Sequence, residues 1–346
     1  MKIAVAVSGG TDSLYALLAL KDQGHDVFAL HAHFLEPSLE REQAIGAMCA
    51  GLNIPFHPVD VHKEFEACVV QPFMDEYIEG RTPNPCALCN SRMKFGALLR
   101  EAQALGADMM ATGHYAVLED HPEYGRVLSK GHDPKKDQSY FLSLVAREDL
   151  AKAVFPLGKK CKADIKAELA ERGIAPAFPS ESQEICFVPD DDYRAFLINR
   201  GAKLGTGGNM QLADGTVVGK HHGLWQYTEG QRRGLGVAWK EPLYVIRKDI
   251  KQNVLIVGTK AELLSSSCTV EQFNYLVDKS LWGSELYVRT RYRQRPIAAS
   301  LSEKNGQLVV TYDEPQSPPA NGQVCCVYDK DLHVLGGGII EHSIYS

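Results

Sequence analysis

Three of the nine cysteines lie among polar residues and prolines, where a thiol has a chemical use as well as a packing use. Cys86 and Cys89 occur in RTPNPCALCNSRMKFG (81–96), and Cys186 occurs in ESQEICFVPDDDY (181–193). A cysteine thiolate is both a nucleophile and a metal ligand, so these three need a chemical explanation. Five others lie in apolar or strand-like stretches and are expected to be buried and reduced: Cys49, Cys68, Cys268, Cys325 and Cys326.

The Cys86-x-x-Cys89 pair follows two prolines, which force an extended approach to it. We predict that Cys89 lies near the start of a helix, where the helix dipole would lower the pKa of its thiol. The same spacing would also suit half of a structural zinc site. That alternative needs a second ligand pair, and the sequence offers no other CxxC and no HxxxH.

A glycine loop, SGGTDS (8–13), follows the first strand-like run. Its glycines allow close approach to an anion, and the helix expected behind it offers unpaired N–H groups. The loop is neither a Walker A motif nor GxGxxG. It matches the pyrophosphatase loop of ATP-dependent enzymes that form an adenylate and release pyrophosphate. The alternative is an ordinary helix-capping turn, and Asp12 is expected to hold the loop or a magnesium ion.

Basic residues in the second half of the chain suit a nucleic acid. In RTRYRQR (289–295) the arginines alternate, so in a strand they would share one face and suit a phosphate backbone: Arg289, Arg291, Arg293 and Arg295. The alternative is a solvated outer strand. A second basic point is GQRRGLG (230–236), which could be a structural turn or an RNA contact.

Alternating strands and helices must position these groups in the first half of the chain. Strands are predicted at 1–7, 26–34, around 54–61 and at 107–115; helices are predicted at 13–23, 41–52, 63–79 and 90–105. The order indicates a doubly wound parallel α/β sheet, which binds ligands at the carboxyl ends of its strands. The glycine loop and Gly113 of ATGHY both lie at such ends.

Beyond about residue 200 the chain is rich in turns and short strand-like runs, at 242–248, 253–259, 285–293, 307–313, 323–329 and 334–340. This spacing is typical of small sheets and barrels. We therefore expect a catalytic domain over 1–203, a small β-rich central domain over 204–275 and a C-terminal β-barrel over 276–346.

Composition agrees with a globular protein of two or three domains. The 346 residues are 45% apolar and 23% charged, and 37 basic against 43 acidic residues give a net charge of −6. These values exclude a disordered or collagen-like chain. No apolar run approaches the ~20 residues that a bilayer requires, so we expect a cytoplasmic protein without a membrane partner. A nucleic-acid site must then be a local basic patch.

The motifs together resemble those of the tRNA-specific 2-thiouridylases, which replace the 2-oxo group of the wobble uridine with sulfur. SGGTDS, TPNPCALCN with KFG, ATGHY, KKDQSYFL, SQEICFVPDDDY, YTEGQRRGLG and LGGGII occur in that family's order, across nearly the whole chain. The resemblance implies an adenine-nucleotide alpha-hydrolase-like domain. It also implies ATP with Mg²⁺ as a substrate, tRNA as the partner, and persulfide sulfur from a cysteine desulfurase, delivered directly or through a relay protein.

The resemblance also implies roles for individual residues. Cys89 would be the first catalytic cysteine and Cys186 the persulfide carrier, joined transiently by a disulfide. ATP would be held by Ala6, Val7, Ser8, Gly9, Gly10, Thr11, Asp12, Ser13, Ala32 and Gly113. The residues beside the target base would be Asn84, Pro85 and Cys86. Further tRNA contacts would come from Lys136, Asp137, Gln138, Arg291 and Tyr292.

The chain departs from the family pattern at several points. Many members have Asp at the position of Cys86, and a methionine at the position of Ala32, which here lies within His31-Ala32-His33. The connection after Phe34 is shorter than usual. Two other functions remain open on the residues alone. One is another adenylate-forming enzyme, such as an amidotransferase-type synthetase, and the other is a zinc or iron–sulfur RNA-binding protein without turnover.

Overall fold

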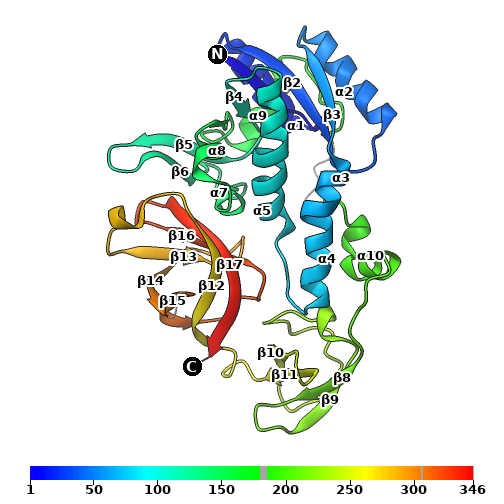
Figure 1. Ribbon diagram of the computed structural model, residues 1–346, viewed down its shortest axis with the longest axis vertical. Helices are drawn as coiled ribbons and strands as arrows, with labels where there is room; N and C mark the ends of the chain where they lie inside the picture. The colour runs from blue at the N-terminus through cyan, green and yellow to red at the C-terminus, as the bar shows by residue number, and fades with distance from the viewer. Residues whose placement is uncertain (180–184, 305–306, 346) are drawn as a thin grey trace.

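Three β-sheets organise the chain in a computed structural model that describes residues 1–179, 185–304 and 307–345. In Figure 1 a parallel sheet near the N-terminus lies at one end of the long axis and a small four-stranded sheet lies at the other. A barrel that ends the chain lies beside the axis between them. Among the described residues, none of the helices combines the length and apolar character needed to cross a membrane.

The N-terminal sheet is parallel throughout, with strand order β3-β2-β1-β4-β7. Its strands are β1 (Lys2–Ala6), β2 (Asp26–His33), β3 (Phe56–Asp60), β4 (Met109–Ala111) and β7 (Ala153–Val154). Ile3 and Val5 pack in one core cluster, on the side of α1 (Thr11–Asp22), while Ala4 packs in another. Burial on both faces explains why β1 is apolar throughout, and the predicted doubly wound sheet is confirmed.

Two long helical segments lie outside this sheet, and each contains a π-helical stretch. The first comprises α3 (His62–Phe65), η1 (Glu66–Val70) and α4 (Gln71–Ile78); the second comprises α5 (Pro85–Cys89), η2 (Asn90–Leu98) and α6 (Leu99–Ala104). The second begins earlier than the predicted residue 90. Its start is set by Asn84, whose side chain accepts a hydrogen bond from the Ala87 N–H at 3.2 Å, and by Pro85 in the first helical position.

Other elements complete the N-terminal half. They are α2 (Leu39–Gly51), β5 (Ala116–His121), β6 (Gly125–Lys130), α7 (Ser139–Leu142), α8 (Arg147–Leu150), α9 (Lys162–Glu171), η3 (Pro189–Asp191) and α10 (Tyr193–Asn199). The β5–β6 hairpin pairs with the last strand of the chain, where Ser129 lies opposite His333. This pairing ties the N-terminal half directly to the barrel.

The central sheet has the order β10-β11-β8-β9 and its own small core. Its elements are β8 (Gly208–Gln211), β9 (Val217–His221), η4 (Leu224–Gln226), β10 (Tyr244–Asp249) and β11 (Val254–Gly258). The barrel contains β12 (Ser265–Tyr275), η5 (Lys279–Leu281), β13 (Leu286–Arg289), β14 (Ile297–Lys304), β15 (Gln307–Gln316), β16 (Val324–Tyr328) and β17 (His333–Tyr345). β12 closes it by pairing with both β15 and β17, so the expected β-rich central domain and C-terminal barrel are confirmed.

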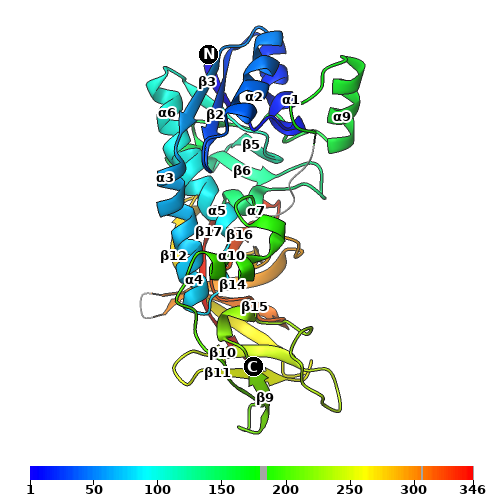
Figure 2. The ribbon, with the colours of Figure 1, turned by 90° about the vertical axis from the view of Figure 1, so that its right-hand side faces the viewer.

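The exact domain boundaries, expected after residues 203 and 275, stay a prediction. Because β12 belongs to the barrel, its pairing favours a start of the third unit at about Ser265. The arrangement along the long axis, with the central sheet at the end opposite the N-terminal sheet, is also visible in the turned view of Figure 2.

Candidate active site

The glycine loop forms at the carboxyl end of β1 and leads directly into α1. The Ser13 hydroxyl donates to the Gly10 carbonyl at 3.0 Å, while the Ser8 N–H donates back to the Ser13 oxygen at 3.2 Å. Gly9 has a φ of +82°, a conformation that favours glycine. Gly10 is the N-cap of α1, and no side chain caps the helix. The first N–H groups of α1 are therefore available to an anion.

Asp12 is held by two residues from other parts of the N-terminal domain. Its Oδ1 accepts hydrogen bonds from the Tyr115 hydroxyl at 2.7 Å and from Lys162 Nζ at 2.5 Å. Lys162 is buried, with 8% of its surface exposed. Asp12 was expected to hold either the glycine loop or a magnesium ion, and these hydrogen bonds favour the first role. Lys162 was not among the predicted site residues, and its only signal in the sequence is its position among the lysines of KKCKAD (159–164).

Gly113 and Phe178 pack against the loop from two sides. A Cβ atom on Gly113 would lie 3.0 Å from the Asp12 Cβ, so the end of β4 closely contacts the start of α1. The Phe178 N–H donates to the Gly9 carbonyl at 2.9 Å, and its ring fills the space beside Gly9. Arg41 stacks on that ring with its guanidinium 4.5 Å from the centroid. Phe178 is thus held against the loop by both its backbone and its ring.

Ala32 lies on β2 between two histidines that point to the opposite face of the sheet. Its methyl group packs against two hydrophobic clusters, so this side chain offers only an apolar contact. His31 contacts the Val7 carbonyl through Nδ1 at 2.8 Å. Burial lowers the pKa of His31, so the ring is neutral and donates to that carbonyl, which joins β2 to the loop. His33 pairs with Glu42 at 3.0 Å.

Cys89 lies near the start of a helix, as predicted, because it is the fifth residue of the helical segment that begins at Pro85, but the prediction of a lowered thiol pKa is wrong. Cys86 is the second residue of α5, whereas Cys89 is its last, one turn further along and packed against a hydrophobic cluster. Burial raises the pKa of the Cys89 thiol to about 12, and burial also raises the pKa of Cys86. The positive charge of Lys94 opposes both shifts.

The fold brings Cys186 to the same place from far along the chain. Its neighbours Ile185, Phe187 and Val188 pack in the hydrophobic cluster that Cys89 contacts. The Cys186 thiol interacts electrostatically with those of Cys86 and Cys89, and burial raises its pKa while Lys94 lowers it. Cys186 lies in a turn, and the strand-like run expected before it, Glu181 to Glu184, lies outside the described residues.

Lys94 connects the three thiols to the end of β4. Its Nζ lies 3.5 Å from Nε2 of His114, the residue after Gly113, and Nδ1 of His114 lies 2.6 Å from the Thr112 hydroxyl. Burial lowers the pKa of His114 well below its usual value, so a neutral ring faces the ammonium group. Lys94 is the first residue of the KFG motif (94–96), but it was not among the predicted site residues.

The residues expected to touch tRNA after the ATGHY strand are partly committed to internal contacts. Asp137 is 3% exposed, accepts from the Gly131 and Ser139 N–H groups at 3.1 Å, and pairs with Arg289 at 2.8 Å. Gln138 accepts a hydrogen bond from the Tyr115 N–H at 3.0 Å through its side chain. The tRNA contacts of Lys136, Asp137 and Gln138 stay a prediction, and the buried Asp137 carboxylate is the least available of them.

The expected row of four arginines on one strand face is wrong. β13 ends at Arg289, and residues 290–296 form a turn that Gln294 closes by accepting from the Thr290 N–H at 2.8 Å. Arg289 is buried, and Arg291 donates to the Pro318 carbonyl at 2.7 Å. Only two members of the row are exposed, Arg293 and Arg295. The ring of Tyr292 lies 4.4 Å from that of Phe141, centroid to centroid.

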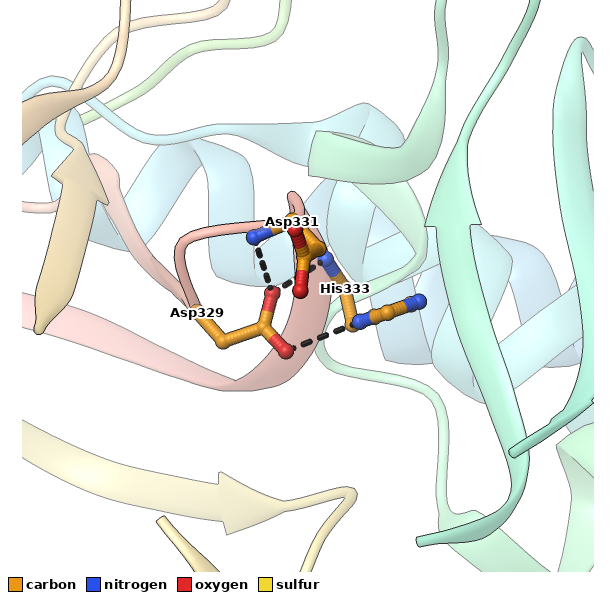
Figure 3. Close-up of side chains that lie close together, drawn as sticks. All are labelled: Asp329, Asp331 and His333. Carbon is orange, nitrogen blue, oxygen red and sulfur yellow. Dashed lines mark hydrogen bonds and ion pairs between the residues drawn. The ribbon is translucent and has the colours of Figure 1, made fainter. Parts of the chain in front are cut away.

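In the described parts of the chain, potential metal ligands lie close together at one place, and none of them is a cysteine. Figure 3 shows this group, Asp329, Asp331 and His333, in the turn between β16 and β17. Asp329 accepts from the N–H groups of Asp331 at 3.0 Å and His333 at 2.9 Å, and its other oxygen bonds the His333 ring at 2.8 Å. These bonds explain the group as a turn closed by its own side chains. Neither Cys86 nor Cys89 belongs to it.

Three family models match consecutive parts of the chain. They are described as a tRNA methyl transferase HUP domain (residues 1–190), a tRNA methyl transferase PRC-barrel domain (residues 194–259) and an aminomethyltransferase beta-barrel domain (residues 265–340). The order agrees with the three sheets, since the parallel sheet, the central sheet and the barrel fall in successive matches.

Full-length relatives carry a more specific name. The tRNA-specific 2-thiouridylase MnmA of Nitratidesulfovibrio vulgaris (strain DSM 19637 / Miyazaki F) is 56% identical over 347 residues, which cover 98% of this chain and 99% of that protein. That of Lawsonia intracellularis is 48% identical over 352 residues, covering 99% and 100%. A solved U34-tRNA thiolase, NcsA from Methanococcus maripaludis with its [4Fe-4S] cluster, has a TM-score of 0.37 and 16% identity, covers 58% of this chain and 65% of its own, and carries no further argument.

Proposed function

The chain belongs to the tRNA-specific 2-thiouridylase family, and on that premise we propose a two-step mechanism acting on the wobble uridine. Membership makes it a tRNA sulfurtransferase that uses ATP and places sulfur at position 2 of a tRNA uridine. The first proposed step transfers AMP to the 2-oxo oxygen. The second replaces the activated oxygen with persulfide sulfur.

The glycine loop would bind the triphosphate of ATP. The 2-oxo oxygen of uracil is a poor leaving group. When that oxygen attacks the α-phosphorus of ATP, pyrophosphate is released and the oxygen becomes part of AMP, which is a good leaving group. Residues 6–13, Ala32 and Gly113 would hold the nucleotide, with the uncapped N-terminus of α1 facing the phosphates. Mg²⁺ would arrive with ATP, because Asp12 is already occupied by Tyr115 and Lys162.

Sulfur would come from a persulfide on Cys186. Its terminal sulfur attacks carbon 2 of the adenylated uridine, and the carbon–oxygen bond breaks to release AMP. The Cys89 thiol then attacks the inner sulfur of Cys186, which breaks the sulfur–sulfur bond and leaves 2-thiouridine with a Cys89–Cys186 disulfide. A thiol reductant would restore both cysteines, and a cysteine desulfurase, directly or through a relay protein, would reload Cys186.

One observation carries this proposal: Lys94 lies between the three thiols and the end of β4 that packs against the glycine loop. Its charge acts on all three thiols, and its Nζ lies 3.5 Å from His114, next to the glycine that packs on Asp12. A neighbouring cation favours the thiolate, which is the reactive form. Sulfur chemistry and ATP chemistry would therefore take place side by side.

The tRNA would enter where the thiols converge. Asn84, Pro85 and Cys86 would lie beside the target base. Contacts further along the RNA would come from Lys136, Asp137, Gln138, Arg291 and Tyr292. Arg293 and Arg295 supply exposed charge next to the last two.

An isotope experiment tests the adenylation step. A tRNA transcript carrying ¹⁸O at the 2-position of the wobble uridine is incubated with the protein, ATP and a persulfide donor, and AMP is examined by mass spectrometry. The proposal predicts one ¹⁸O atom in AMP for each 2-thiouridine formed. AMP without the label, alongside thiolated tRNA, would contradict the adenylate.

A further inference from the structure

The chain between η4 and β10 forms a loop that is fixed at both ends. At its start, the Gly230 N–H donates to the Val245 carbonyl at 2.8 Å, and the Val245 N–H donates to the Gln231 carbonyl at 2.9 Å. Leu235 and Leu243 are buried in the core of the central sheet. The segment between these two leucines is therefore an anchored bulge.

This bulge presents an aromatic side chain to solvent. Gly234 and Gly236 have φ values of +79° and +68°, which turn the chain on either side of buried Leu235. Trp239 follows, and 41% of its surface is exposed. An exposed tryptophan on an anchored loop offers a large, rigid contact surface at low entropic cost.

Unpaired positive charge lies on the same loop as the tryptophan. Arg232, Arg233 and Lys240 are exposed, and within the described residues no hydrogen bond or ion pair engages their side chains. Glu241 is the only acidic residue between positions 230 and 243. Residues 232 and 234–243 line an open hollow. In a chain with a net charge of −6, this is a local basic patch of the kind that a polyanion requires.

We propose that this loop, residues 231–243, is a second RNA-contacting surface, where Trp239 stacks on a nucleotide of the tRNA and the three cations contact its phosphates. The inference rests on the proposed function, because tRNA is the polyanion that the protein acts on. Aromatic stacking beside basic side chains is the usual way that proteins bind an unpaired nucleotide. The loop belongs to the central sheet, so its contacts lie outside those that select the target base.

The test measures tRNA affinity across a salt series for W239A, W239F and R232Q/R233Q. Removing the stacking ring should weaken binding by roughly 5- to 100-fold in W239A, with W239F close to wild type because it keeps an aromatic ring. R232Q/R233Q should flatten the log–log salt dependence by roughly 0.7–0.9 for each phosphate that is no longer neutralised. The probe is a full-length tRNA transcript that the wild-type protein has been shown to thiolate. If the wild type fails to thiolate any tRNA, the proposed function fails, whatever the loop does.

Two matched controls change residues in the central sheet or next to its strands. V217A removes an exposed apolar side chain from β9, and K251Q/K260Q removes two exposed charges outside the loop. Melting temperatures establish that every variant is folded. The proposal is overturned if W239A and R232Q/R233Q bind tRNA as the controls do. It is equally overturned if W239A keeps its tRNA affinity but loses binding to anionic lipid vesicles.

Discussion

Lys94 is the positive charge that the three clustered thiols share. Burial raises the pKa of Cys86, Cys89 and Cys186, and the ammonium group of Lys94 lowers each of them. The departure at Cys86, where many family members have Asp, therefore leaves a neutral thiol in place of a carboxylate at neutral pH. A protonated thiol is a poor proton acceptor, so Cys86 does not suit the role of a general base.

Replacing Lys94 with methionine should shift the pH dependence of thiolation. Without the ammonium group the pKa values of the thiols rise further, so the thiolate forms at higher pH and the rate–pH curve moves upward in pH. The measurement is the single-turnover rate of 2-thiouridine formation across pH for wild type, K94M and K94R. K63M, at an exposed lysine on α3, is the matched control. A slower K94M enzyme with an unshifted profile would mean that Lys94 acts on packing alone.

The Asp12–Lys162 pair should support both stability and ATP use. K162M leaves the Asp12 carboxylate with only the Tyr115 hydroxyl, next to the expected phosphates of ATP. We expect a loss on the order of 2 kcal/mol in the free energy of unfolding, below the roughly 3–5 kcal/mol of a fully buried pair because Asp12 is partly exposed. KM for ATP should also rise. K166M, at an exposed position on α9, is the control. Equal effects from K162M and K166M would contradict a specific contribution of the Asp12–Lys162 pair to stability and ATP use.

Among the elements, the turn between β13 and β14 determines what each arginine can do. Sequence periodicity extended the strand to residue 293, but Gln294 closes a turn just after Arg289, and the alternation of side chains ends there. Arg289 instead bonds Asp137 across the interface between the barrel and the N-terminal domain. The row of four therefore contains one buried arginine that pairs with Asp137, one that donates to a backbone carbonyl, and two that are exposed.

The two kinds of arginine should separate in experiment. R293Q/R295Q should weaken tRNA binding and flatten its salt dependence by roughly 0.7–0.9 for each phosphate left without a cation, without changing the melting temperature. R289Q leaves the Asp137 carboxylate buried and unpaired, which should cost about 3–5 kcal/mol in the free energy of unfolding. Thermal unfolding and a tRNA titration series check both expectations. An R289Q protein as stable as wild type would contradict the structural role of this pair.

At the scale of elements, the sequence predicts features that are determined by neighbouring residues better than features that depend on contacts between distant parts of the chain. The parallel sheet and the glycine loop follow from short patterns, since β1 must be apolar on both faces and Gly9 must adopt a positive φ. The π-helical stretch that begins after Cys89 has no comparable pattern. Lys162 and Arg289 also could not be assigned from sequence, because their partners Asp12 and Asp137 lie far away in the chain and meet them only in the folded protein.

At the scale of the whole molecule, the candidate site lies where the N-terminal domain meets the barrel. Gln323, just before β16, donates to the carbonyls of Thr82 at 2.8 Å and Pro83 at 3.1 Å, in the segment that leads into Asn84 and α5. Arg81 pairs with Glu76 of α4 and with Glu271 of β12. Residues of the barrel thus fix the position of the segment 81–83, which precedes Cys86 and Cys89. Figure 1 shows α4 running from the N-terminal domain toward the central sheet, which connects the two ends of the molecule.

In the proposed mechanism, sulfur passes from Cys186 to an adenylated uridine with the help of Cys89. The measurement is nucleoside mass spectrometry of tRNA after reaction with ATP and a persulfide donor, together with pyrophosphate release, for wild type, C89S, C186S and C86S. We expect no 2-thiouridine from C89S or C186S, although both still release pyrophosphate in the presence of tRNA, and a much milder loss from C86S. Thiolation by C89S or C186S at close to the wild-type rate would contradict it, and so would equal losses in C86S and C89S.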